Sequence, residues 1–165
     1  MKFCPMCGTI HTVSVTVCEF CNYQEKSLDK LSKQEIDELM ACFEYEMIDD
    51  GVRLKAVKNY RLRGAIAVPH FVTEIAPNAF ADCKFITRVD LPKALRSIGE
   101  SAFAHCGDLF DVFIPASVNY VGKDAFSDCY ELGVICVASP SQPDGWDSQW
   151  LSGSIAKVEW SSTEE

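Results

Sequence analysis

The sequence predicts a β-rich α/β repeat solenoid with short helical turns, preceded by a small zinc-binding module and a linker helix. Three observations lead to this prediction. A 23-residue pattern recurs in the second half of the chain, four cysteines form two close pairs near its start, and an amphipathic stretch lies between them. Because 48% of the 165 residues are hydrophobic, the chain is also able to bury a sizeable core.

Residues 1–24 are predicted to form the zinc-binding module. Cys4 and Cys7 make one C-x2-C pair, and Cys18 and Cys21 make a second pair after ten intervening residues. Four thiolates that converge on one point suit tetrahedral Zn2+, and a segment this short cannot fold on apolar burial alone. The segment resembles the zinc-ribbon modules at the N-termini of many bacterial proteins. We therefore expect a zinc ribbon whose structural Zn2+ binds as the segment folds.

Other chemistry at these cysteines has less support. A redox C-x-x-C pair normally opens a helix within a βαβ unit, and no such pattern surrounds Cys4 or Cys18. A catalytic zinc needs an open coordination position, whereas four cysteines close the shell. His11 is one further candidate ligand, although it fits a strand residue at the surface better. The sequence leaves open whether the metal is zinc or iron.

Residues 25–43 are predicted to form the linker helix. Ser32 and Glu35 have the spacing of a capping box, in which each side chain satisfies a free backbone N–H at the start of a helix. An apolar stripe at helical spacing follows, and its members are Ile36, Leu39, Met40 and Phe43. We expect this stripe to pack against the end of the next domain, with a partner helix as the alternative.

Residues 44–138 are predicted to form the solenoid with its N-terminal cap. Three kinds of residue recur with a step of 23: the prolines Pro69, Pro92 and Pro115, the cysteines Cys83, Cys106 and Cys129, and the phenylalanines Phe80, Phe103 and Phe126. A single coil cannot bury its own apolar edge, so stacked coils should align equivalent side chains in columns about 4.8 Å apart. We expect the cysteine column to serve packing rather than metal binding, and a short helical turn to hold each Ala-Phe pair.

The repeat unit also carries a resemblance to a known family. The unit from Ile98 to Pro115 reads Ile-Gly-x-x-Ala-Phe-x-x-Cys-x-x-Leu-x-x-Val-x-Ile-Pro. This pattern is similar to the BspA-like leucine-rich repeats of bacteria, and the similarity covers about residues 64–138. The resemblance implies a solenoid of the leucine-rich-repeat type that serves in protein recognition or surface display and has no catalytic activity. The apolar stretch of a secretion signal is missing near Met1, so we expect a cytoplasmic protein.

Both ends of the solenoid need a cap. On the N-terminal side, residues 45–57 read as a hairpin that turns at Asp50-Gly51. Positive charge gathers here and just after, on Arg53, Lys55, Lys58, Arg61 and Arg63. These side chains are expected to protect a sheet edge from pairing with another chain. Contact with nucleic acid or with an acidic partner is the alternative interpretation.

Residues 139–165 are predicted to form the C-terminal cap and tail. Trp146 and Trp150 are four residues apart and would share one face of a helix, and Trp160 follows. We expect these rings to close the solenoid as a hydrophobic lid, with stacking on a glycan as the alternative. An incompletely covered end would allow self-association, because an open sheet edge presents unpaired backbone groups.

The outward positions of the predicted strands supply the candidate functional residues. Arg88, Asp90, Asp111 and Phe113 alternate with buried positions, and an aromatic residue among charges is typical of a protein-contact site. An isolated exposed ring is the simpler interpretation of Phe113. The net charge of −9 disfavours nucleic acid, and no apolar run reaches the roughly 18 residues of a membrane span. His11, His70 and His105 are scattered, so we predict a non-enzymatic scaffold that binds a protein.

Overall fold

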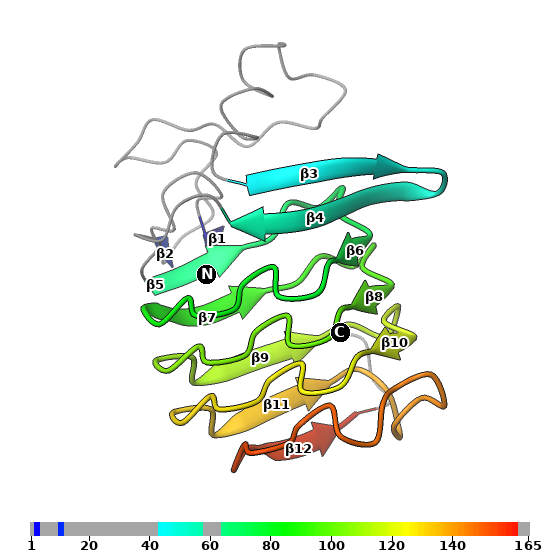
Figure 1. The fold of residues 1–165 in the computed structure, drawn as a ribbon. Helices are drawn as coiled ribbons and strands as arrows, with labels where there is room; N and C mark the ends of the chain where they lie inside the picture. Colours follow the sequence, from blue (N-terminus) through cyan, green and yellow to red (C-terminus); the bar gives the residue numbers. More distant parts are fainter. Residues whose placement is uncertain (1, 4–9, 12–42, 58–63, 162–165) are drawn as a thin grey trace.

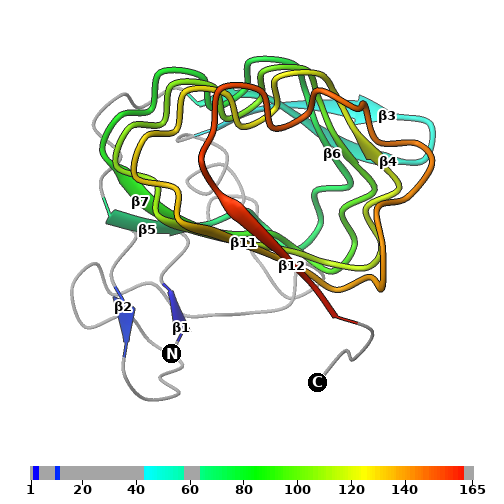
Figure 2. The ribbon, with the colours of Figure 1, turned by 90° about the horizontal axis from the view of Figure 1, so that it is seen from below.

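The computed structural model describes residues 2–3, 10–11, 43–57 and 64–161, and it shows a stack of coils (Figure 1). Within these ranges every element is a β-strand and no helix occurs. The chain winds from the hairpin at the top of Figure 1 to the last strand at the bottom. Figure 2 looks along the stack and shows that successive coils superimpose. The predicted solenoid is therefore confirmed.

Two five-stranded sheets form two walls of the stack. Sheet I contains, in spatial order, β12 (Lys157–Trp160), β11 (Val134–Val137), β9 (Asp111–Ile114), β7 (Ile86–Asp90) and β5 (Gly64–Ala67). Sheet II contains β10 (Tyr120–Val121), β8 (Ser97–Ile98), β6 (Glu74–Ile75), β4 (Gly51–Val57) and β3 (Phe43–Ile48). Every pair in these two sheets is parallel except β3 with β4.

The pairing register follows the 23-residue step of the sequence. Val89 in β7 lies beside Val112 in β9, which in turn lies beside Ile135 in β11. In sheet II, Ile75, Ile98 and Val121 pair in the same way. Each coil therefore places an identical set of positions directly over the coil before it, as the repeat predicts.

The third side of each coil carries the Ala-Phe pair, and the prediction of a helical turn there was wrong. Asn78 and Asp82 have left-handed backbone angles, as do the residues 23 and 46 positions later. These six φ values lie between 52° and 62°, at Asn78, Asp82, Ser101, His105, Asp124 and Asp128. A right-handed helix cannot continue through such a residue. The segment forms turns instead.

Hydrogen bonds explain why the turns are favoured over a helix. The N–H groups of Ala79, Ala81 and Cys83 donate to carbonyls three residues back in their own coil. The alternate N–H groups, from Asn78, Phe80 and Asp82, donate to carbonyls of the next coil at 2.8–3.0 Å. The third side therefore joins neighbouring coils as a sheet does, whereas a helix would keep all of these bonds within one coil.

The core lies between the three sides and consists of columns. Phe80, Phe103 and Phe126 are fully buried, and the first two rings stack with centroids 4.8 Å apart and planes at 10°. The rings of Phe103 and Phe126 follow at 5.1 Å and 5°. These separations match the strand spacing, because each ring belongs to a different coil. Within the described part of the chain, no polar or charged residue is buried.

The N-terminal end of sheet II is capped by the predicted hairpin of β3 and β4. Its turn residues are Asp49 and Asp50, and Gly51 already pairs with Ile48. A Cβ atom at Gly51 would lie 2.1 Å from Oγ1 of Thr73 in the next coil, so only glycine fits there. Oγ1 of Thr73 also accepts a hydrogen bond from the N–H of Val52, which fastens the cap to the stack.

The C-terminal segment adds a strand to sheet I. β12 pairs with β11, and Val158 lies beside Ile135, again 23 residues apart. The rings of Trp146 and Trp150 are buried with centroids 5.0 Å apart, and Trp150 packs edge-on against Phe126. These tryptophans form the hydrophobic lid that the sequence predicts. They do so without a helix: Trp146 forms a parallel bridge with Val121, and Trp150 lies in a turn.

Several sequence predictions concern residues outside the described ranges. Cys4, Cys7, Cys18 and Cys21 lie there, as does the linker helix except for its last residue. That residue, Phe43, begins β3 and is buried against Phe80, so its place in a helical stripe was wrong. Two short strands, β1 (Lys2–Phe3) and β2 (Ile10–His11), pair antiparallel, and β1 lies near β5.

Candidate functional site

The candidate site is the outer face of sheet I, where the outward side chains of successive strands form two rows. The first row runs through Arg88, Asp111, Val134 and Lys157, which are register partners on β7, β9, β11 and β12. The second row runs through Asp90, Phe113, Cys136 and Glu159. We call Arg88, Asp90, Asp111 and Phe113 the outer ladder. The structure brings these four predicted residues together on one surface.

Charge in the outer ladder is arranged around Arg88. Its Nε lies 3.3 Å from Oδ1 of Asp90, and its Nη1 lies 3.5 Å from Oδ2 of Asp111. Burial raises the pKa of Asp90, and the charge of Arg88 offsets part of this shift. These pairs are partly exposed to solvent and so contribute little to stability. Their main effect is to hold two carboxylates and one guanidinium at fixed positions beside Phe113.

Phe113 is the apolar member of the outer ladder. Its side chain is 47% exposed, although it lies in the middle of a regular strand between buried Val112 and Ile114. Its neighbours across the sheet are Asp90 on one side and Cys136 on the other. An exposed aromatic ring on a rigid strand with charged neighbours has the features of a contact hot spot.

The cysteine column serves the fold, as predicted. The Sγ of Cys106 donates a hydrogen bond to the carbonyl of Phe80 at 3.2 Å, and the Sγ of Cys129 donates to the carbonyl of Phe103 at 3.1 Å. Burial raises the pKa of Cys83 to about 11, so its thiol stays protonated at neutral pH. The thiols of Cys106 and Cys129 therefore each satisfy a carbonyl of the preceding coil while they fill space in the core.

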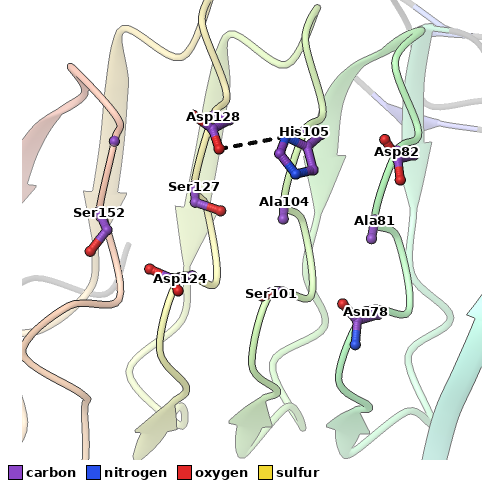
Figure 3. Close-up of a pocket in the computed structure, with 11 residues that line it drawn as sticks. Asn78, Ala81, Asp82, Ser101, Ala104, His105, Asp124, Ser127, Asp128 and Ser152 are labelled. Carbon is purple, nitrogen blue, oxygen red and sulfur yellow. Dashed lines mark ion pairs between the residues drawn. The ribbon is translucent and has the colours of Figure 1, made fainter.

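The third side carries a shallow polar groove that the sequence analysis did not identify (Figure 3). It is lined by side chains at the left-handed positions, among them Asn78, Asp82, Asp124 and Asp128. The recurrence of Asn, Asp, Ser and His at these positions was the available signal, because such residues tolerate positive φ better than others. The groove is thus a by-product of the turn chemistry of each coil.

His105 lies in this groove beside an aspartate of the next coil. Its Nδ1 is 3.6 Å from Oδ2 of Asp128, which is the equivalent position in the next coil (Figure 3). In the described part of the chain, no serine hydroxyl forms a hydrogen bond with His105. Nor do three His, Cys, Asp or Glu side chains of the described residues gather as a metal site would require.

Comparison with known proteins identifies the repeat. The sequence model of the BspA type leucine rich repeat region matches residues 55–142, in six copies. The chain belongs to this family. The match covers more than half of the chain and extends beyond the predicted repeat at both ends. No curated protein is similar enough in sequence to count as a relative.

Solved structures share the fold of this BspA-type chain. A leucine-rich repeat protein from Bacteroides capillosus is 26% identical and superimposes with a TM-score of 0.60, over 72% of this chain and 94% of that one. A leucine-rich repeat protein from Bacteroides ovatus is 22% identical with a TM-score of 0.56. The match covers 72% of this chain but only 36% of the Bacteroides ovatus protein. The chain therefore spans nearly all of the Bacteroides capillosus protein but only about a third of the Bacteroides ovatus protein.

The two alternative binding sites from the sequence fit the structure less well. Arg53 forms ion pairs with Glu46 at 3.3 Å and with Glu74 at 2.8 Å, so its charge is compensated within the cap. Lys58, Arg61 and Arg63 lie outside the described residues. Trp146 and Trp150 are buried and cannot offer a ring face to a glycan. No helix within the described ranges has the length and apolar character needed to cross a bilayer.

Proposed function

We propose that this BspA-type chain is a non-enzymatic scaffold that binds a protein partner through the outer ladder of sheet I. Leucine-rich-repeat proteins generally mediate protein interactions, because stacked coils present an extended and regular surface. The outer ladder is the part of that surface where an exposed aromatic ring, two carboxylates and a guanidinium occur together. The observation that carries the proposal is the exposure of Phe113 in the middle of this ladder.

The geometry of the outer ladder favours a partner with an apolar pocket that accepts the ring of Phe113. The strand is held on both sides by parallel neighbours, so the ring loses little conformational freedom when a partner binds. Asp90 and Asp111 supply acceptors on its flank. A partner with donor groups around a pocket would satisfy them, and this arrangement of an apolar centre with a polar rim is typical of protein interfaces.

We further propose that Cys4, Cys7, Cys18 and Cys21 bind a structural Zn2+ ion. The donor set supports zinc, since four thiolates give a closed tetrahedral shell without an open position for catalysis. The pairing of Phe3 with Ile10 supports it as well, because it makes neighbours of two residues that bracket Cys4 and Cys7. The free thiols of Cys83, Cys106, Cys129 and Cys136 are compatible with the cytoplasmic location that we propose.

The test compares two exposed aromatic residues on different walls. Phe113 in sheet I and Tyr120 in sheet II are 47% and 48% exposed, so Tyr120→Ala is a matched control for Phe113→Ala. Affinity purification with each chain as bait, with zinc retained, should recover a protein with the unsubstituted chain and with Tyr120→Ala. Phe113→Ala should lose it, and the purified partner should bind that variant at least about tenfold more weakly. Equal binding by both variants would show that the partner does not bind through the outer ladder.

A further inference from the structure

The C-terminal edge of sheet I is formed by β12. β12 is the last strand of sheet I, and within the described residues no strand pairs with its outer side. The N–H of Lys157 donates to the carbonyl of Gly133, just before β11, and the N–H of Ser161 donates to the carbonyl of Val137 in β11, both at 2.9 Å. In a strand, alternate residues direct their N–H and C=O groups to opposite sides. The backbone groups of Val158 and Trp160 therefore point away from β11.

The side chains around this edge are also incompletely covered. Val158, Trp160 and Leu151 are only partly buried against the core, and Ile155 is 84% exposed. The outward side chains of β12 are Lys157 and Glu159, which form an ion pair at 2.8 Å. Among the described residues, the edge thus combines backbone groups that no strand pairs with, an apolar margin and one charge of each sign.

We propose that two copies of this chain join through their β12 strands in antiparallel pairing, centred on Val158. In this register, Val158 lies opposite Val158 of the second copy, and Trp160 lies opposite Ala156. Val158 and Trp160 direct their backbone groups to the free side, and in the dimer the carbonyl of Ala156, the residue before β12, would accept from the N–H of Trp160. The N–H of Ala156 already binds Oγ of Ser154 at 3.2 Å, so four hydrogen bonds remain to be formed across the two-fold axis. Two copies related by such an axis form a closed dimer.

Charge complementarity selects this register and the second copy as the occupant. Centring on Val158 places Lys157 opposite Glu159 of the second copy, and Glu159 opposite its Lys157. Opposite residues without mutual hydrogen bonds are the closest pairs of an antiparallel ladder, so these charges would meet at both sites. The edge strand of sheet II at the N-terminal end lacks this property. Pairing of β3 with itself around Tyr45 would place Glu44 opposite Glu46, and like charges repel.

The dimer would join the two copies of sheet I into one continuous sheet. Lys157 and Glu159 would face the same side in both copies, so the two outer ladders would lie on a single surface. The half-buried side chains at the end of each stack, and Ile155, would be covered by their counterparts. The inference does not depend on the proposed function of the ladder, because Phe113 lies on β9 and takes no part in the contact.

The test is a charge exchange read by sedimentation velocity on the full chain. Lys157→Glu places two carboxylates opposite each other at both sites, and Glu159→Lys places two amines there. Each change should weaken the dimer at least about tenfold. The double variant Lys157→Glu with Glu159→Lys should restore it, and mixing the two single variants should yield a dimer that contains one of each. Lys93→Glu is the control, because it changes the net charge as Lys157→Glu does, but at an exposed position outside β12.

A second variant tests the backbone contact. Val158→Pro removes an N–H group that points away from β11, so the single copy should keep its fold by circular dichroism while the dimer is lost. A chain that stays monomeric at every concentration would overturn the proposal, and Lys157 would then protect the edge. A dimer that is equally strong in the Lys157→Glu, Glu159→Lys and Lys93→Glu variants would also overturn it.

Discussion

The ring of Phe103 lies parallel to the ring of Phe80, with their centroids 4.8 Å apart and their planes at 10°. The two residues are 23 positions apart in sequence, which is the length of one coil, so they occupy the same position in successive coils. Parallel stacking at this distance follows from the backbone, which advances by one strand spacing per coil. The stack of rings is thus a direct measure of the register of the solenoid.

Loss of a stacked ring should destabilise the fold strongly. Phe103→Ala should lower the free energy of unfolding by about 3–5 kcal/mol, because a fully buried ring leaves a cavity between two others. Phe110 is 50% exposed, so Phe110→Ala should change the free energy of unfolding by less than about 1 kcal/mol. Denaturant unfolding of both variants measures the difference. Similar small losses in the two would show that the ring of Phe103 is not in the core.

Two glycines should differ in their tolerance of a methyl group. A Cβ atom at Gly122 would lie 2.5 Å from the backbone N of Glu100 in the preceding coil, whereas one at Gly133 would meet nothing within 4 Å. Gly122→Ala should therefore force the coils apart and cost about 1–3 kcal/mol. Gly133→Ala should be neutral or stabilise the protein by up to about 1 kcal/mol. Thermal unfolding compares them, and equal effects would contradict the close stacking of coils.

Stability should fall at alkaline pH through Cys83. Burial raises the pKa of this thiol from 9.0 to about 11. Between these values the unfolded chain releases the proton while the folded chain keeps it, so the free energy of unfolding decreases as pH rises. Below pH 9 this effect is absent, because both states hold the proton. The free energy of unfolding, measured across this pH range, should decline less steeply for Cys83→Ala than for the unsubstituted chain. Parallel declines would contradict the assigned burial of the thiol.

Metal removal should separate the N-terminal segment from the solenoid. We expect one Zn2+ ion per chain by elemental analysis, lost in Cys4→Ser and retained in Cys136→Ser, because Cys136 lies on the outer face of sheet I. Chelation should leave the unfolding of the repeats unchanged, since the coils bury their apolar columns against one another. Retention of the metal by Cys4→Ser would exclude the proposed ligand set. Unfolding of the repeats on chelation would show that the two parts depend on each other.

The sequence predicts the stacking well because a 23-residue period leaves one way to bury every coil at once. The columns of Phe80 and Cys83, the hairpin cap and the tryptophan lid follow from that period and from the need to cover both ends. The helical turns were mispredicted because Ala-Phe pairs favour a helix locally. The left-handed residues Asn78 and Asp82 and the bonds to the next coil outweigh this preference.

Other features were less accessible to sequence reasoning. β12 keeps the step of 23 from Val134 to Lys157, but Trp150 stands 24 residues after Phe126, so the final coil no longer matches the pattern. The outer ladder was predicted from strand alternation, which places Arg88, Asp90, Asp111 and Phe113 on one face. The contacts of Arg88 with both carboxylates depend on rotamers, and a residue pattern does not determine those.

The central claim is that equivalent side chains of successive coils meet in columns. Nuclear Overhauser effects between selectively labelled phenylalanine rings test it most directly, because such effects report protons within about 5 Å, the spacing of neighbouring strands. The structure requires effects from the ring of Phe103 to the rings of both Phe80 and Phe126, and none between Phe80 and Phe126. Absence of both Phe103 contacts in the folded protein would contradict the coil register and everything built on it.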